Sequence, residues 1–202
     1  MTPSLLDVSA KALLDRIASQ TPTPGGGSAA ALAGATAAAL VAMVAGMKKT
    51  RTGSEHDRAE LDLALRHAKE SGERLRALVD EDAAAFEAVL AARQLPRETE
   101  TEKAARQDQV AAALARAAEV PMETARACAV VLGAASMALA YGNPNAASDA
   151  RAAGALAWAG LVAAIENVRI NLDGQSEHPL IREADARVRE ATERLKAFGL
   201  TS

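Results

Sequence analysis

One carboxylate of this sequence falls on an apolar helix face. Asp82 lies within a stripe of large apolar side chains spaced three and four residues apart, namely Leu75, Leu78, Val79, Phe86, Val89 and Leu90. A carboxylate on such a face needs a hydrogen-bonding or charged partner, and burial raises its pKa toward the range that is useful for proton transfer. Asp82 is therefore either a packing contact between helices or a catalytic or ligand-binding acid.

A glycine-rich turn precedes a long apolar segment. It consists of Pro24, Gly25, Gly26, Gly27 and Ser28. Glycine permits close approach of the backbone, and the free N–H groups of a helix N-terminus attract anions and carbonyl oxygens. The turn is not a phosphate-binding loop, because no Gly-Lys-Ser/Thr follows it, and no strand precedes it as in dinucleotide-binding proteins. It is either a tight turn or a cradle for a ligand.

Two further polar groups interrupt the apolar pattern. Asn143, Ser148 and Asp149 follow one another at a turn, where they either cap the next helix or bind a ligand. Asn167 and Asn171 are four residues apart and share a helix face. Asp149 and Asn167 are about 27 Å apart along one helix, so they cannot both touch one small reacting group in one subunit. They would meet different parts of a long ligand, or sites shared across a dimer.

The elements that position these residues are predicted to be helices. Aromatic residues make up only 2% of the chain, while alanine, the best helix former, is abundant and no alternating strand pattern is present. Thr99 and Glu102 are spaced like a capping box, and Pro121 suits the first turn of a helix. The pattern predicts seven helices, over residues 2–20, 28–47, 55–92, 99–118, 121–140, 146–172 and 180–198.

Composition limits the class of protein further. Residues 1–202 are predicted to form one all-α domain of about seven helices around an apolar central helix. Helices that are apolar on every side must be buried, so we expect a homodimer or a higher assembly. Residues 25–47 carry no charge, but they are mostly alanine and glycine, so we expect a cytoplasmic protein that does not span a membrane.

Several other classes of function are disfavoured. The 23 basic and 26 acidic residues nearly balance and are spread along the chain, which argues against nucleic acid as a partner. Three scattered histidines and one cysteine make a metal site unlikely to form. Cys128 lies in an apolar run, which is typical of a small core residue and not of a nucleophile.

These segments occur together in one order along the chain. The order is the turn 24–28, Asp82 to Phe86, Val120-Pro121, Asn143 to Asp149, and Asn167 to Leu172. In this it resembles the formimidoyltetrahydrofolate cyclodeaminase and methenyltetrahydrofolate cyclohydrolase family, which also forms the C-terminal part of formiminotransferase-cyclodeaminase. The resemblance covers nearly the whole chain and implies an all-helical fold that assembles as dimers.

The resemblance implies a reaction on a tetrahydrofolate derivative, with no prosthetic group and no metal. A general acid–base carboxylate is needed, for which Asp82 is the first candidate and Asp149 the second. The turn 24–28 is expected to cradle the folate, and Lys48, Lys49 or Arg51 is expected to meet its glutamate tail. Asn143, Asn167 and Asn171 are expected to hydrogen-bond the pterin or to orient the acid, and Ser148 is expected to bind the substrate as well. The alternative is a non-catalytic protein, either a folate binder or a helical scaffold.

Overall fold

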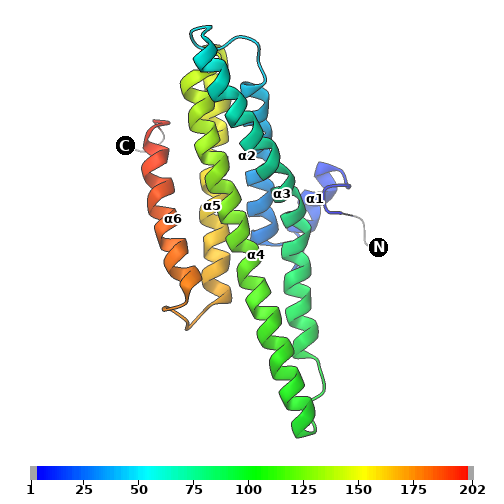
Figure 1. Cartoon of the computed structure of the whole chain (residues 1–202). Helices are drawn as coiled ribbons and strands as arrows, with labels where there is room; N and C mark the ends of the chain where they lie inside the picture. Colours follow the sequence, from blue (N-terminus) through cyan, green and yellow to red (C-terminus); the bar gives the residue numbers. More distant parts are fainter. Residues whose placement is uncertain (1–3, 200–202) are drawn as a thin grey trace.

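Helices make up nearly all of the computed structural model, which describes residues 4–199 (Figure 1). Within that range there are six α-helices, one 3-10 turn and an isolated bridge between Thr50 and Gly142. The elements are α1 (Ala10–Ile17), α2 (Gly26–Ala45), α3 (Glu55–Arg93), α4 (Glu100–Tyr141), η1 (Pro144–Ala146), α5 (Ala147–Asn171) and α6 (Pro179–Lys196). The prediction of an all-α domain is confirmed, with six helices in place of seven.

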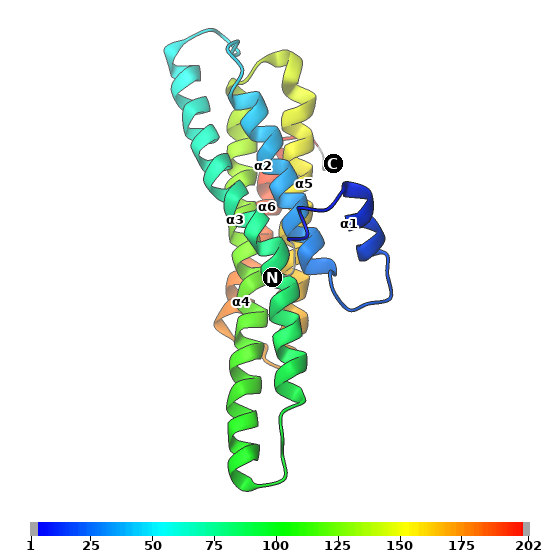
Figure 2. The ribbon, with the colours of Figure 1, turned by 90° about the vertical axis from the view of Figure 1, so that its right-hand side faces the viewer.

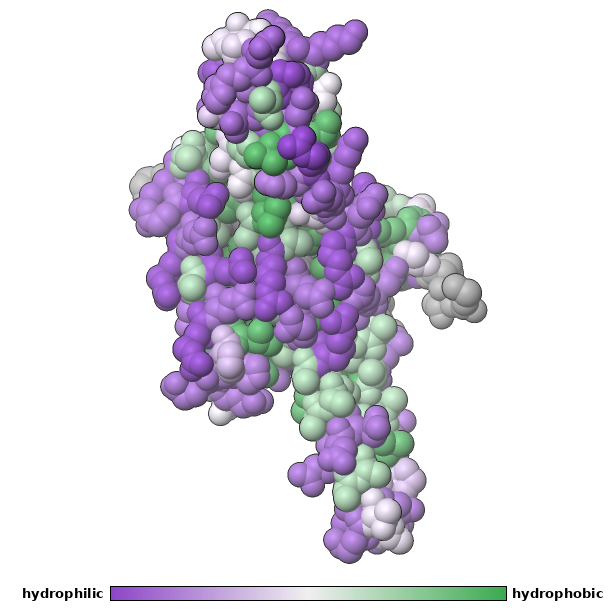
Figure 3. Space-filling model, in the orientation of Figure 1, coloured by the Kyte–Doolittle hydropathy of each residue, from purple (hydrophilic) through white to green (hydrophobic). Residues whose placement is uncertain are grey.

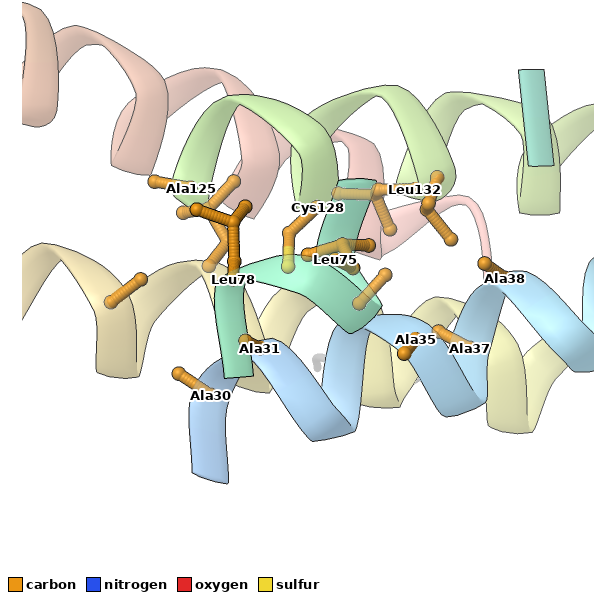
Figure 4. Close-up of a cluster of buried hydrophobic side chains, with 14 of the residues drawn as sticks. Ala30, Ala31, Ala35, Ala37, Ala38, Leu75, Leu78, Ala125, Cys128 and Leu132 are labelled. Carbon is orange, nitrogen blue, oxygen red and sulfur yellow. The ribbon is translucent and has the colours of Figure 1, made fainter. Parts of the chain in front are cut away.

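Helix α2 is the central helix, and it packs against α3, α4 and α5. Its buried residues point to every side and are almost all alanine, glycine or valine (Figure 4). A Cβ atom on Gly34 would lie 2.5 Å from the Sγ of Cys128, so α4 approaches the α2 backbone directly. Cys128 is fully buried, and burial raises the pKa of its thiol to about 12. The prediction that Cys128 is an inert core residue is therefore supported by its position.

Helices α3 and α4 form a hairpin that extends beyond the rest of the bundle. They contain 39 and 42 residues, whereas α2 contains 20 and α5 contains 25. The lower ends of α3 and α4 in Figures 1 and 2 therefore project past the first residue of α2. This difference in length creates a step on the surface of the bundle, and Asp82 lies at the level of that step.

The predicted break before Pro121 is wrong, because α4 continues through this residue without interruption. A proline inside a helix has no N–H to donate, which leaves the carbonyl of the residue four positions earlier without its usual partner. Here that carbonyl belongs to Ala117, and the Nδ2 atom of Asn171 donates to it at 2.7 Å. A side chain from α5 thus replaces the hydrogen bond that Pro121 cannot make.

The N-terminal helix is shorter than predicted and stands apart from the bundle (Figure 2). Its cap is Ser9, whose hydroxyl accepts the Ala12 N–H, so helix formation begins at Ala10; the predicted start at Thr2 lies outside the described residues. Asp80 of α3 accepts hydrogen bonds from the Ser4 hydroxyl at 2.6 Å and from the Leu5 N–H at 2.8 Å. These bonds attach the chain before α1 to the bundle.

The chain by itself covers only part of its apolar surface (Figure 3). Three segments are long and apolar enough to cross a membrane by length and composition alone, and the windows concerned are 44% to 56% buried within the chain. The segments are Gly26–Ala45, Glu100–Tyr141 and Pro144–Asn171. Large apolar side chains that stay exposed include Met43, Val130 and Ile170.

Candidate functional site

The carboxyl group of Asp82 lies against the first turn of α2. Its Oδ2 atom is 3.1 Å from the Ser28 hydroxyl, which is also 2.9 Å from the Val79 carbonyl. The N-cap residue of α2, Gly25, provides no side-chain hydrogen bond. Asp82 therefore supplies the acceptor that an N-cap side chain would normally provide, from a different helix.

Gly27 makes this contact possible. A Cβ atom at that position would lie 2.5 Å from the Cγ of Asp82 and 2.7 Å from its Oδ2. Both distances are shorter than real Cβ contacts, so no residue with a side chain fits beneath the carboxyl group. Of the three glycines in the turn, Gly27 is thus the one needed for close approach, and the group that approaches is the Asp82 carboxyl. A Cβ atom at Gly25 or Gly26 would meet its nearest neighbour at 3.4 Å, which is an ordinary contact.

Burial raises the pKa of Asp82 above the usual aspartate value. Hydrogen bonds from the Ser28 side chain and backbone oppose this effect, because they favour the ionised form. The Ser28 hydroxyl has one proton and two acceptors within reach, so it can donate to Val79 and accept from a protonated Asp82, or donate to an ionised Asp82. Both protonation states of the acid therefore find a partner, as proton transfer requires.

Asn167 lies next to the same turn. A Cβ atom on Gly26 would be 3.4 Å from its Nδ2 and 3.9 Å from its Oδ1. The Nδ2 atom donates to the Ala163 carbonyl at 2.8 Å, whereas Oδ1 has no hydrogen-bond partner within residues 4–199. Asp82, Gly26, Ser28 and Asn167 therefore form one group of polar atoms, which we call the step site, where α2 begins and α5 nears its end.

The side-chain amide of Asn171, one turn beyond Asn167, donates a hydrogen bond within the bundle. Its bond to the Ala117 carbonyl joins α4 to α5 at the level of the step site. The structure therefore gives Asn171 a structural contact, and the expected contact with the pterin is not needed to explain its presence.

Four charged side chains join α3 to α4 beside Asp82. Arg74 pairs with Glu81 and Glu123, and Arg116 pairs with the same two carboxylates, at 2.7 Å in the case of Glu123. Hydrogen bonding from Arg74 holds the pKa of Glu81 below its usual value. This group was not predicted from the sequence, although each helix carries an arginine and a glutamate seven residues apart, a spacing that places both on one face.

The remaining predicted site residues lie at the other end of α2. The bridge between Thr50 and Gly142 brings the segment containing Lys48 next to the turn that contains Asn143. Ser148 and Asp149 begin α5 at this end. Because α2 has 20 residues, the two ends are separated by about 30 Å.

The predicted site residues thus form two groups within one chain. Asp149 cannot share a small reacting group with Asp82, and it cannot replace Asp82 in the step site of the same subunit. Asn143 uses its Oδ1 to accept the Asn145 N–H at 3.1 Å, as a turn residue does. Lys48 and Ser148 are exposed and form no side-chain hydrogen bond with any residue from 4 to 199.

The buried acid of this far group is Asp57, which the sequence analysis did not identify. It accepts the Thr50 hydroxyl at 3.0 Å and both the hydroxyl and the N–H of Thr52. These bonds hold the pKa of Asp57 below its usual value, the backbone bond from Thr52 contributing most. Asp57 holds the loop after α2 in place. Its hydrogen bonds favour the ionised carboxylate, so a structural role accounts for its burial.

No group of three or more His, Cys, Asp or Glu side chains is placed to hold a metal ion between residues 4 and 199. The step site therefore offers a part-buried acid with a hydroxyl partner, free N–H groups at a helix N-terminus and an amide oxygen. Such a set can bind a polar small molecule and exchange a proton with it. Residues 4–199 thus form an all-α protein with a candidate site for a small molecule at the start of α2.

Comparison with known proteins places the chain in a family. Residues 9–190 match the formiminotransferase-cyclodeaminase family profile, and the protein belongs to this family. It is 39% identical over 174 residues to the methenyltetrahydrofolate cyclohydrolase of Methylorubrum extorquens, covering 84% of this chain and 82% of that protein. It is 32% identical to the formimidoyltransferase-cyclodeaminase of Rattus norvegicus, of which it spans 32%.

The fold agrees with a solved structure of a similar protein. The crystal structure of formiminotetrahydrofolate cyclodeaminase from Thermotoga maritima matches with a TM-score of 0.78 and 28% sequence identity. The match covers 97% of this chain and 94% of that one. The similarity therefore extends over the step site and over the far end of α2.

Proposed function

We propose that this enzyme of folate one-carbon metabolism, a cyclohydrolase or cyclodeaminase, uses Asp82 to move the proton of its reaction. The observation that supports the proposal most directly is the position of Asp82 against Gly27 and Ser28. Burial raises its pKa, and Ser28 can serve either protonation state. The substrate is a tetrahydrofolate derivative, and the proposed chemistry needs no prosthetic group.

The first candidate reaction is hydrolysis of methenyltetrahydrofolate. The ionised Asp82 takes a proton from water as the water oxygen bonds to the methenyl carbon, which gives a tetrahedral intermediate. The bond from this carbon to N5 then breaks, Asp82 returns its proton to N5, and the new hydroxyl loses its proton to solvent as it becomes the formyl oxygen. The similar protein that favours this reaction is the Methylorubrum extorquens cyclohydrolase, most of whose length is covered.

The second candidate reaction is deamination of formiminotetrahydrofolate. Here N10 attacks the carbon of the protonated formimino group on N5, which gives a tetrahedral carbon. Asp82 takes the proton that N10 loses and returns it to the formimino nitrogen, whose bond to carbon breaks as it leaves as ammonia. The family profile and the Thermotoga maritima cyclodeaminase support this alternative. Both reactions pass through a tetrahedral carbon and both need one proton transferred, so Asp82 has the same role in each.

Binding of the substrate is proposed to use the α2 N-terminus and Asn167. The N–H groups of Gly26 and Gly27 are polarised by the helix and suit a carbonyl oxygen of the pterin, while the free Oδ1 of Asn167 suits a ring N–H. Lys48 is proposed to bind the glutamate carboxylates. Because Lys48 is about 30 Å from Asp82 in one chain, we propose that it binds the tail of a folate held in the step site of a second copy of the chain.

We therefore propose a cytoplasmic homodimer. The support is the apolar surface that one chain leaves uncovered, including Met43, Val130 and Ile170. Sedimentation velocity of the purified protein tests the assembly directly. A monomer at every concentration would contradict the dimer and, with it, the contact between Lys48 and the substrate of a neighbouring step site.

Loss of methenyltetrahydrofolate absorbance above the spontaneous rate is the primary test. Asp82→Asn keeps the size of the side chain and its contact with Ser28 but removes the base, so we expect at least about a hundredfold lower kcat with the helical circular dichroism unchanged. Glu70→Gln is the matched control and should retain full activity, because Glu70 is an exposed acid of the same helix with no hydrogen-bond or ion-pair partner among residues 4–199.

The variant Asp149→Asn, measured in the same assay, shows which of the two predicted carboxylates has the acid–base role. Loss of activity in this variant with full activity in Asp82→Asn would transfer the acid–base role to the far end of α2. If the wild-type protein turns over neither folate substrate, the family reaction is excluded for this chain and a folate-binding or scaffold role takes its place.

A further inference from the structure

A regular stripe of α3 faces α2. Gly72, Leu75 and Asp82 contact α2 at positions progressively nearer its N-terminus, and Val79 lies between them on the same face. The spacing along this stripe alternates between three and four residues, as expected for one helix packed along another. The next position in the same series is Phe86.

Phe86 is the first residue of this stripe that has no part of α2 above it. Asp82 already contacts Gly27, and α2 begins at Gly26. Phe86 lies about 6 Å along α3 from Asp82 and therefore about 4–5 Å beyond the start of α2. The exposed fraction changes accordingly: Val79 is 1% exposed and Phe86 is 39% exposed. A phenyl ring is thus left uncovered one helical turn from the carboxyl group of the proposed acid.

The other aromatic side chains lie away from Phe86. Trp158 is half-buried on α5, nine residues before Asn167 and therefore about 14 Å along that helix from it. Phe198 is buried and fills the space above Gly154. Tyr141 packs edge-to-face with His56 at the opposite end of α2, with ring centroids 5.4 Å apart. An exposed apolar residue alone is common on protein surfaces, but here the exposed residue is aromatic and borders the step site.

We propose that Phe86 is the ring-binding wall of the step site, on which the aminobenzoyl ring of the folate substrate stacks. This inference rests on the proposed function. In that substrate the reacting carbon is bonded to N10, which is bonded to the aminobenzoyl ring. A ring stacked on Phe86 therefore places the reacting carbon near Asp82, because one turn of α3 separates the two side chains.

The stacking also defines the class of substrate. A one-carbon pterin without the arylamine has nothing to place on Phe86, so it binds less tightly than a complete folate. The fragment p-aminobenzoylglutamate, in contrast, retains the contact. Phe86 thus selects for the arylamine half of the molecule, whereas the α2 N-terminus and Asn167 bind the pterin half.

Calorimetric titration with 5-formyltetrahydrofolate, a stable folate that neither reaction consumes, tests the wall. Phe86→Ala is expected to weaken binding about tenfold and Phe86→Leu about fivefold, while Phe86→Tyr stays within about twofold of wild type. Leu90→Ala is the matched control, since Leu90 is similarly exposed one turn further along α3, and it should bind as wild type does. p-Aminobenzoylglutamate should show the same order of variants.

The outcomes separate this inference from the proposed function. Wild-type turnover with equal binding by wild type and Phe86→Ala would overturn the wall and leave the enzyme assignment intact. Binding that depends on Phe86 in a protein that turns over neither substrate would support the wall and overturn the reaction. Equal losses in Phe86→Ala and Leu90→Ala, accompanied by dissociation of the assembly in sedimentation, would show that Phe86 serves the contact between subunits and would overturn the wall.

Discussion

Replacing Gly27 with alanine should remove activity with little loss of stability. The added Cβ would stand 2.5 Å from the Cγ of Asp82 and closer still to its Oδ1, so the carboxyl group must move by about 1 Å or more to reach 3.4 Å, the lower end of ordinary contact. Misplacement of a reacting group by about 1 Å costs on the order of a hundredfold in rate. We therefore expect kcat/KM to fall about a hundredfold in the methenyltetrahydrofolate assay.

The stability of the same variant is set by opposing effects. Alanine is favoured over glycine inside a helix by about 1 kcal/mol. Loss of the hydrogen bond between Ser28 and Asp82 costs about 0.5–1.5 kcal/mol. The free energy of unfolding in urea should therefore stay within about 1 kcal/mol of wild type.

Gly133→Ala is the control for this experiment. A Cβ at Gly133 meets only the mobile end of Arg194, at 3.3 Å, and the residue lies within α4 away from the step site. It should be slightly more stable and fully active. Wild-type activity in Gly27→Ala would refute the placement of Asp82 as the working acid, and a large loss of stability would show that the glycine serves folding.

Three other perturbations give independent results. Asn171→Leu should lower the free energy of unfolding by about 1–3 kcal/mol because it leaves a buried carbonyl unpaired, and Pro121→Ala should reverse most of that loss in the double variant by restoring the helix N–H. Gly34→Ala should cost about 1–3 kcal/mol, measured by urea unfolding, because its Cβ overlaps the buried Cys128 thiol. The raised pKa of Asp82 means that the folded protein binds this proton more tightly than the unfolded chain, so the stability of wild type relative to Asp82→Asn should fall as pH rises from 3.8 through the folded-state pKa. A constant difference between the two urea titration series across that range would show that Asp82 is not buried in solution.

Local patterns predicted most of the helices and singled out all four residues of the step site, although not that they lie together. Helix α3 was expected over 55–92 and is found at Glu55–Arg93, because its stripe and the Ser54 cap are local signals. The capping box of Thr99 and Glu102 forms as expected. Asp82 was singled out because it interrupts an apolar stripe, and that irregularity is visible without any tertiary information.

The features that were missed depend on contacts between distant segments. Continuity of α4 through Pro121 depends on Asn171, fifty residues later, which no local rule connects to a proline. Exposure of Phe86 depends on where α2 begins relative to α3, so the stripe alone predicted burial. The separation of Asp149 from Asp82 likewise follows from the length of α2, which lies between the two ends.

The bond from Asn171 to the Ala117 carbonyl has a consequence for how this sequence can change over generations. A proline at position 121 costs less stability where an amide at position 171 can reach the freed carbonyl. The residues at these two positions are therefore expected to vary together. A lineage that gained the proline first would pass through a destabilised intermediate, whereas one that gained the asparagine first would not. Asparagine at 171 with an ordinary residue at 121 should therefore occur among homologues more often than the reverse combination.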